Sequence, residues 1–160
     1  MKSVLFLCTG NSARSILAEA YLNHAGGGRF RAYSAGSKPA GQVNRFALEL
    51  LRRRGVAFAE ARSKSWDEFA LPGAPKLDFI FTVCESAAAE ACPLWPGRPA
   101  TAHWGIADPA AVTGPDASKR RAFEQAFSAL TRRIDAFLAL PLDQLDVSGL
   151  SKELNAIGRL

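Results

Sequence analysis

The residues that decide the fold are those at positions 4–15, which read Val4-Leu5-Phe6-Leu7-Cys8-Thr9-Gly10-Asn11-Ser12-Ala13-Arg14-Ser15. A short apolar run ends at a cysteine, and a stretch with helical character begins at Ser15. This order predicts a buried strand, a loop and then a helix whose N-terminus faces the loop. The backbone N–H groups of such a loop and the helix dipole favour negative charge at one spot. The segment therefore predicts an oxyanion-binding loop at the end of a strand.

Two side chains give this loop its chemistry. The same electrostatic field lowers the pKa of a thiol, so we expect Cys8 to be a thiolate nucleophile at neutral pH. Arg14 supplies a planar fork that binds two oxygens of a tetrahedral anion. The structural alternative is a buried cysteine that ends a core strand, with Arg14 solvated on the helix. The spacing and the strand–loop–helix context favour the nucleophile.

Composition places the chain among ordinary globular proteins. Its 160 residues are 48% apolar and 22% charged, which predicts one domain with a real core. The apolar runs are too short for a signal peptide or a membrane span, so we expect a cytoplasmic protein with no membrane partner. Three cysteines, an odd count, argue against a secreted disulfide framework and for reactive thiols. The two histidines lack nearby ligand partners, which makes a zinc site improbable.

The net charge of +5 does not indicate nucleic acid as a partner. The basic residues cluster at 52–54 and 119–121, within segments of helical character, where such runs form solvated helix faces. Nucleic-acid binding requires basic residues interleaved with aromatic ones or a recognisable module. The positive surface instead favours the arrival of small anions.

Short apolar runs alternate with helical patterns along the chain, which is typical of βαβ units around a parallel sheet. Strands are expected at Lys2–Leu7, Phe30–Ser34, Leu77–Val83 and Ala100–Trp104. Helices are expected at about 15–25, 42–54 and 116–138, with a helical turn at 66–69. The pattern predicts an α/β three-layer sandwich with a four-stranded, flavodoxin-like parallel sheet. We expect residues 1–140 to form this domain and residues 141–160 a C-terminal helical extension without chemistry of its own.

The reactive candidates follow the carboxyl ends of these strands. Cys8 follows the first strand, Ser34 ends the second, Cys84 follows the third and Asp108 lies just past the fourth. Ligands of such sheets bind at this edge. Asp108 is placed to protonate a leaving oxygen from the face opposite the nucleophile. Asp108-Pro109 is also a common turn signal, but its position opposite the Cys8 loop favours catalysis.

The second and third cysteines bracket a strongly helix-forming sequence, residues 85–91. A helix would hold the Cα atoms of Cys84 and Cys92 roughly 12 Å apart, whereas a disulfide needs about 7 Å or less. The pair can therefore bond only if this helix unwinds. Cys8 and Cys84 end strands expected to be neighbours, so a small movement would join them. A relay from Cys8 to Cys84 to Cys92 becomes possible; two buried, functionless cysteines are the alternative.

Three motifs now combine: Cys-Thr-Gly-Asn-Ser-x-Arg-Ser at 8–15, Val-Cys followed by Ala-Cys-Pro at 83–93, and His-Trp-Gly-x-x-Asp-Pro at 103–109. Together they resemble the thioredoxin-coupled arsenate reductases, which share the fold of low-molecular-weight protein tyrosine phosphatases. The resemblance covers roughly residues 1–137. It implies an enzyme of arsenic resistance and detoxification that reduces arsenate to arsenite, with phosphate or sulfate as competing oxyanions. The substrate would be held by the loop residues Thr9, Gly10, Asn11, Ser12, Ala13 and Arg14.

The resemblance also implies a role for each thiol. Cys8 would attack arsenate, and Asp108 would protonate the departing hydroxide, while Ser15 stabilises the thiolate. Cys84 would then attack Cys8 and release arsenite, and Cys92 would attack Cys84. The resulting redox-active disulfide would be reduced by thioredoxin. The interval between Cys84 and Cys92 is one residue longer than in some members, which leaves glutaredoxin with glutathione as another reductant.

Some members bind a potassium ion near the loop. Asn11, Glu19, Ser34 and Asp67 occupy matching positions here, so potassium is a possible cofactor and no other is expected. We expect a monomer.

Two other functions compete with this one. A phosphatase acting on aryl phosphates would use the same Cys8, Arg14 and Asp108. Such enzymes usually carry an aromatic residue after Asp-Pro, where this chain has Ala110, and they leave Cys84 and Cys92 unexplained. A non-enzymatic module that senses an oxyanion would not need the complete set of nucleophile, arginine and acid.

Overall fold

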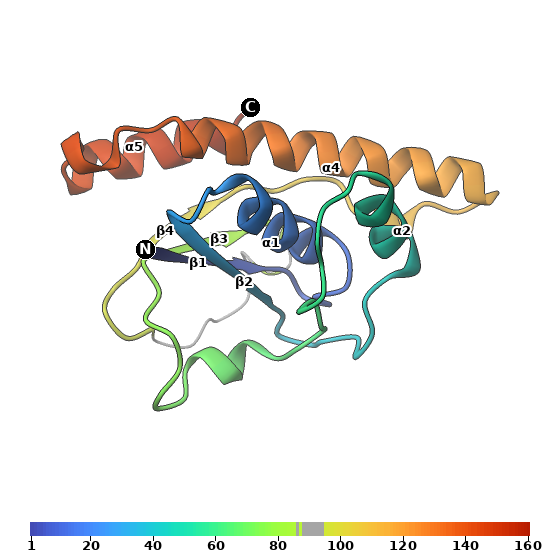
Figure 1. Cartoon of the computed structure of the whole chain (residues 1–160), viewed down its shortest axis with the longest axis horizontal. Coiled ribbons are helices and arrows are strands. Elements are labelled where there is room, and N and C mark those ends of the chain that lie inside the picture. Colours follow the sequence, from blue (N-terminus) through green and yellow to red (C-terminus); the bar gives the residue numbers. More distant parts are fainter. Residues whose placement is uncertain (86, 88–94) are drawn as a thin grey trace.

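The computed structural model describes residues 1–85, 87 and 95–160. Its four strands form one parallel sheet in the order β2-β1-β3-β4 (Figure 1). The strands are β1 (Lys2–Leu7), β2 (Phe30–Ala35), β3 (Phe79–Thr82) and β4 (Ala100–His103). This order and direction confirm the expected flavodoxin-like α/β fold. Cys92, for which a helix end was expected, lies outside the described residues.

The helices follow the sequence pattern closely, with α1 at Arg14–Ala25, α2 at Arg45–Arg53, α4 at Asp116–Leu138 and the 3₁₀ turn η1 at Trp66–Phe69. The helix expected from residue 42 begins later because the side chain of Asn44 caps it by accepting a hydrogen bond from Phe46 N at 2.8 Å. The expected apolar stripe of α4 is buried from Phe123 to Phe137. The basic run on α2 is exposed, and Arg53 and Arg54 both contact Glu124 on α4.

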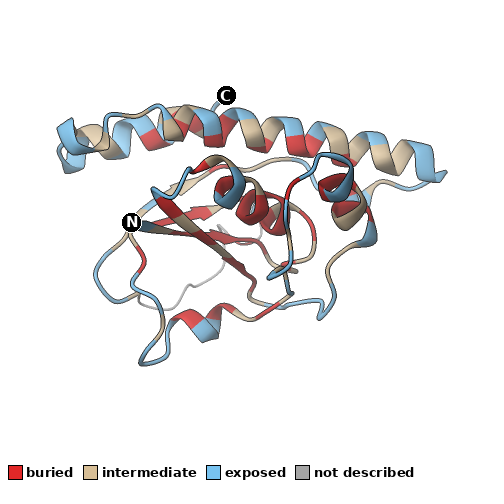
Figure 2. Cartoon of the chain, viewed as in Figure 1, coloured by how far each residue is buried: buried red, intermediate tan, exposed pale blue. Residues whose placement is uncertain are grey.

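The two faces of the sheet carry cores of different size. Figure 2 shows buried positions on the strands and on the helices beside them. Side chains alternate along a strand, so Val4 and Phe6 pack into the larger core while Leu5 and Leu7 face the smaller one. Helices α1, α2 and α4 cover the larger core. On the other face, Trp66 and Phe69 of η1 cover the smaller core. These layers hold the carboxyl end of β1, where the reactive loop begins, between two packed surfaces.

The end of the chain forms the short turn η3 (Leu142–Gln144) and helix α5 (Val147–Ile157), which packs against β4 and α4. Trp104 Nε1 donates to the carbonyl of Leu154 at 2.9 Å, and Leu154 is fully buried. The division of the chain at residue 140 stays a prediction. Within the described residues, no helix is long and apolar enough to cross a membrane.

Candidate active site

The loop between β1 and α1 is shaped by hydrogen bonds to its carbonyl groups. These point outward to neighbouring segments: Lys38 N donates to Thr9 O at 3.0 Å, Ala40 N to Gly10 O at 2.9 Å and Asn44 N to Ser12 O at 2.8 Å. In a trans peptide the C=O and the following N–H point in opposite directions. The N–H groups of Gly10, Asn11 and Ala13 therefore face the other side. The loop thus presents amide donors to the cavity that it encloses.

This cavity has a volume of about 230 Å³ and lies at the carboxyl edge of the sheet. It is lined by the whole loop and by three residues from the segments that follow β3 and β4; the complete lining is Cys8, Thr9, Gly10, Asn11, Ser12, Ala13, Arg14, Cys84, Asp108 and Ala110. Helix α1 begins at Arg14 without a side-chain cap, so its N-terminus adds partial positive charge. The convergence expected at this edge is confirmed for Cys8, Cys84 and Asp108, which line the cavity together with Arg14, whereas Ser34 is not in its lining.

Arg14 and Asp108 face each other across the cavity. Arg14 Nη2 lies 3.5 Å from Asp108 Oδ2, and Nη1 donates to the carbonyl of Ile106 at 3.0 Å. The other carboxylate oxygen of Asp108 accepts from Ala110 N at 2.9 Å, which caps the short turn after it. A guanidinium and a half-exposed carboxyl group therefore flank the same space. The first suits an oxyanion and the second can deliver a proton to it.

Cys8 and Cys84 are both buried, and a hydrogen bond joins their side chains. Cys84 Sγ accepts a hydrogen bond from Thr9 N at 3.3 Å. A hydrogen bond from the Cys8 thiol lowers the pKa of Cys84 to about 5, and the same bond, with burial, raises the pKa of Cys8. The sequence predicted the thiolate on Cys8, whereas these pKa shifts favour the negative charge on Cys84. The hydrogen bond from the Cys8 thiol is the main cause, and the backbone N–H of Thr9 lowers the pKa of Cys84 further.

Beneath the loop, Asn11 is fully buried and has a left-handed backbone conformation, with φ of 44°. Its side chain donates to Ser15 Oγ at 2.8 Å and accepts from Lys64 N at 2.9 Å. Ser15 is also fully buried. Asn11 therefore ties the loop both to the first turn of α1 and to the segment before η1.

The residues proposed for a potassium ion divide into two groups. Asn11, Glu19 and Ser34 are each buried, and Ser34 Oγ donates to Glu19 Oε1 at 3.2 Å. Asp67 is exposed in η1. The Nζ of Lys64 lies 3.8 Å from Glu19 Oε1 and donates to the carbonyl of Arg62 at 2.9 Å. Burial lowers the pKa of Lys64 and raises that of Glu19, while each charge opposes the shift of the other.

Sequence reasoning missed two residues of this site. A Cβ atom on Gly36 would lie 2.3 Å from Thr9 O and 2.4 Å from Cys8 O, so only glycine lets the end of β2 approach the loop. The position of Gly36 directly after the second strand was the feature of the sequence that could have indicated this close approach. Lys64 stands between two serines in a polar segment, and nothing there distinguishes it from a solvated lysine.

Comparisons with known proteins agree with this geometry. Residues 3–152 match the model of the low molecular weight phosphotyrosine protein phosphatase family. The chain is 35% identical over 136 residues to the arsenate reductase of Halalkalibacterium halodurans, covering 85% of this chain and 94% of that protein. Among solved structures, the arsenate reductase of Archaeoglobus fulgidus aligns with a TM-score of 0.61 and 30% identity, over 82% of this chain and 98% of that one.

A thioredoxin-dependent arsenate reductase of Corynebacterium glutamicum aligns with a TM-score of 0.64 and 25% identity, over 90% of this chain. This chain spans 64% of the length of that structure. The family match covers almost all of the chain and includes every residue of the cavity. The chain therefore belongs to the low molecular weight phosphotyrosine protein phosphatase family.

Proposed function

We propose that this chain is an arsenate reductase that converts arsenate to arsenite through its three cysteines. The observation that carries the proposal is the placement of Cys84 beside Cys8 inside the oxyanion cavity. Hydrolysis of a phosphate ester needs one nucleophilic thiol at this position. A second thiol in contact with the first serves a reaction that ends in a disulfide bond. The names of the relatives support the same activity.

In the first step, the loop amides and Arg14 bind arsenate, and the sulfur of Cys8 attacks arsenic. The Cys84 thiolate takes the proton of Cys8 through their hydrogen bond as the S–As bond forms. One arsenate oxygen leaves as hydroxide, and Asp108 protonates it to water. Arg14 exchanges its contact with Asp108 for two arsenate oxygens, which frees the carboxyl group for this role.

In the second step, Cys84 attacks the sulfur of Cys8. The S–S bond forms as the S–As bond breaks, and the electron pair of the S–As bond stays on arsenic, which is reduced from As(V) to As(III). The proton that the two thiols shared ends on an oxygen of the departing arsenite. Thr9 N–H stabilises the Cys84 thiolate for this attack.

In the third step, Cys92 attacks Cys84 and frees Cys8 for another cycle. The new Cys84–Cys92 disulfide is then reduced by thioredoxin. The relative from Corynebacterium glutamicum, described as thioredoxin-dependent, supports this choice of reductant. Glutaredoxin with glutathione is the other candidate. We place the reaction in the cytoplasm, where thioredoxin is kept reduced, and expect the enzyme to act as a monomer.

The lining of the cavity favours an inorganic oxyanion over an aryl phosphate. Among the described residues that line it, none is aromatic, and the residue after Pro109 in this lining is Ala110. An aryl group would therefore find no stacking partner there. Hydrolysis of aryl phosphates, the activity in the name of the family, remains the second candidate function, and the same Cys8, Arg14 and Asp108 would carry it.

One experiment separates the two activities. Arsenate reduction with thioredoxin and hydrolysis of para-nitrophenyl phosphate are measured for the wild type, Cys84→Ser and Cys92→Ser. We expect Cys84→Ser to lose reduction over many turnovers and to keep any phosphatase activity. Cys92→Ser should release about one arsenite per enzyme and stop at a Cys8–Cys84 disulfide, detected by mass spectrometry. Unchanged turnover in Cys84→Ser would refute the relay. Replacing thioredoxin by glutaredoxin plus glutathione identifies the reductant.

A further inference from the structure

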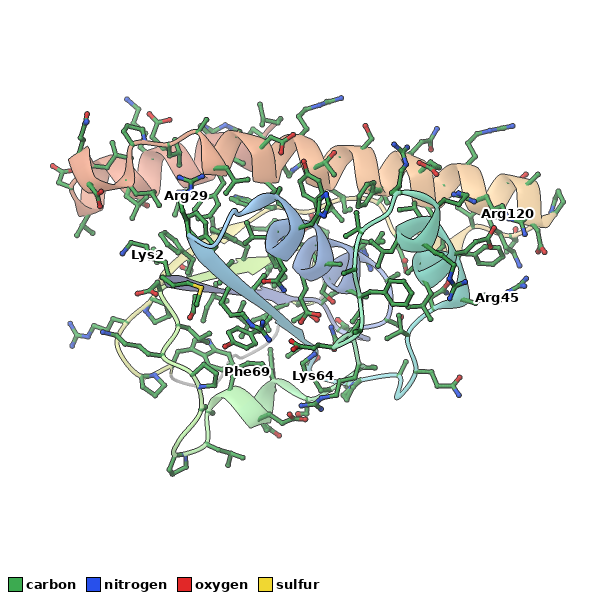
Figure 3. All side chains as sticks on the ribbon, viewed as in Figure 1. Lys2, Arg29, Arg45, Lys64, Phe69 and Arg120 are labelled. Carbon is green, nitrogen blue, oxygen red and sulfur yellow. The ribbon has the colours of Figure 1, made fainter. Side chains whose placement is uncertain are left out.

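A buried lysine lies directly under the oxyanion loop. The side chain of Lys64 is 6% exposed and that of its partner Glu19 is 10% exposed. Charged side chains are almost never buried to this degree unless they are paired. Figure 3 shows Lys64 in the segment that leads toward η1, near the carboxyl end of β2. The two residues come from separate elements, α1 and the segment before η1, so the pair is a tertiary contact that joins them.

The ammonium group lies among oxygen atoms of the kind that bind a monovalent cation. Lys64 Nζ donates to the Arg62 carbonyl at 2.9 Å and lies 3.8 Å from the Glu19 carboxylate. Ser34 Oγ bonds to the same carboxylate oxygen, at 3.2 Å. Carbonyl, hydroxyl and carboxylate oxygens are those that replace the hydration shell of potassium in proteins. In this chain a side-chain cation already lies against them.

These residues do not fit a bound potassium ion. The one carboxylate buried in the group, that of Glu19, is balanced by Lys64, and a second cation would lie close to the ammonium group and be repelled by it. Asn11 Oδ1, which would be a ligand, accepts the backbone N–H of Lys64 at 2.9 Å. Asp67, the other acidic candidate, is exposed in η1.

We propose that the Lys64 ammonium group is a built-in cation that supports the oxyanion loop in place of potassium. Lys64 is a positioning residue that acts through Asn11 and Glu19. Its backbone N–H holds the Asn11 side chain, and its carbonyl accepts from Gly36 N at 2.9 Å. These bonds fix the Lys64 backbone on both sides. They hold the chain so that the ammonium group lies beside Glu19, and the positive charge under the loop is therefore supplied without a dissociable cation.

A tethered cation has a physical advantage over a free one. A free ion loses translational freedom when it binds, whereas the Lys64 ammonium is already attached to the chain. It therefore stays in place at any potassium concentration. Asn11 is the residue that most needs support, because its left-handed backbone is uncommon for a residue other than glycine. This inference concerns the scaffold of the loop and does not depend on which reaction the loop catalyses.

A cavity beside the Glu19–Lys64 pair would let a potassium ion reach the site in a variant that lacks the ammonium group. A cavity of about 290 Å³ adjoins Glu19 and Lys64, with Arg31, Glu60, Arg62 and Glu68 also in its lining. Removing the Lys64 ammonium would leave the Glu19 carboxylate, Ser34 Oγ and the Arg62 carbonyl around an opening that a potassium ion could reach. The variant Lys64→Met should therefore gain a potassium site that the wild type lacks.

The experiment compares potassium chloride with choline chloride at equal ionic strength, using sulfate as the loop ligand. For the wild type we expect the thermal midpoint in the two salts to agree within about 1 °C, and sulfate to bind equally well. For Lys64→Met, potassium should raise the midpoint by about 5 °C and strengthen sulfate binding about tenfold. Lys152→Met is the matched control, because it removes the same charge from an exposed site on α5 and should behave as wild type.

A purely structural role for Lys64 would lower the stability of Lys64→Met without making it respond to potassium. A folded Lys64→Met that shows no potassium response would therefore overturn the proposal. Potassium-specific stabilisation of the wild type would overturn it as well. If Lys64→Met does not fold in choline chloride, potassium chloride should restore folding, and failure to restore it counts against the proposal.

Discussion

The two sides of the oxyanion loop carry two pairs of opposite charges that differ in burial. On the cavity side Arg14 and Asp108 are 3.5 Å apart, with side chains 13% and 41% exposed. On the underside Lys64 and Glu19 are 3.8 Å apart, with side chains 6% and 10% exposed. Solvent screens the first pair, so it exchanges partners at small cost, whereas breaking the second leaves a buried charge. The cavity side therefore suits chemistry and the underside suits support.

The largest expected effect is on the thiol pair of the cavity side. The pKa of Cys84 falls from 9.0 to about 5, chiefly because the Cys8 thiol donates a hydrogen bond to it. Each unit is a factor of ten, so the shift is about 10⁴ in the acid dissociation constant. We expect the thiolate absorbance of the wild type to rise with a midpoint near pH 5. In Cys84→Ser the midpoint should move upward.

The low pKa of Cys84 also predicts the direction in which the free energy of unfolding changes with pH. Because the folded pKa lies below the unfolded one, this thiolate stabilises the fold fully above pH 9.0 and loses that effect as the pH falls through about 5. The difference in unfolding free energy between the wild type and Cys84→Ser should therefore grow as the pH rises between these values. An absorbance midpoint that stays near pH 5 in Cys84→Ser would place the charge on Cys8.

The next largest effect is expected for Arg14→Ala. The guanidinium group can bind two oxygens of the oxyanion, so its loss should lower kcat/KM for arsenate by about 10³. The free energy of unfolding should fall by only about 1 kcal/mol, because its partner Asp108 is 41% exposed and remains solvated without it. Steady-state kinetics and urea denaturation measure the two quantities.

Arg14→Lys is the control for charge alone, since it keeps a cation but loses the planar fork. It should recover a minor part of the activity. If Arg14→Ala instead unfolded the protein and left the activity of the folded fraction unchanged, the division between the two sides of the loop would be wrong.

Glu19→Gln tests the underside. The substitution leaves the Lys64 ammonium buried beside a neutral amide, so we expect the free energy of unfolding to fall by about 3 kcal/mol. Urea denaturation in choline chloride measures it. Asp108→Asn removes a carboxylate from the other side of the loop and should change stability by less than about 1 kcal/mol. Equal losses in the two variants would contradict the comparison.

The residues on the cavity side of the loop could be predicted from the sequence, because the geometry of a parallel sheet brings the ends of its strands together. The carboxyl ends of parallel strands lie at one edge of a sheet, so a correct assignment of strands brings Cys8, Cys84 and Asp108 together. The strand Lys2–Leu7 and the helix Asp116–Leu138 have the predicted bounds because their apolar patterns are long and regular. Spacing alone then places Arg14 at the start of α1.

The underside could not be predicted in the same way. The burial of Lys64 depends on its pairing with Glu19, which lies far from it along the chain and carries no shared pattern with it. The position of the negative charge depends on the hydrogen bond between Cys8 and Cys84 and on the direction of Thr9 N–H, neither of which a residue type specifies. Properties set by tertiary contacts between polar groups are thus the part that required coordinates.

The smallest expected effect is a coupling energy, and it compares the buried pair with an exposed one. A double-mutant cycle with Glu19→Gln and Lys64→Met, in choline chloride, should give a coupling of about 2 kcal/mol, because either single change leaves an unpaired buried charge and the double change leaves none. The pair Arg62–Glu68 is the control, with side chains 62% and 42% exposed and atoms 2.5 Å apart. Its cycle, with Arg62→Gln and Glu68→Gln, should give less than about 1 kcal/mol despite the shorter distance, because water screens both charges. If the coupling energy of Glu19–Lys64 were no larger than that of the exposed pair, burial would not strengthen the ion pair beneath the loop.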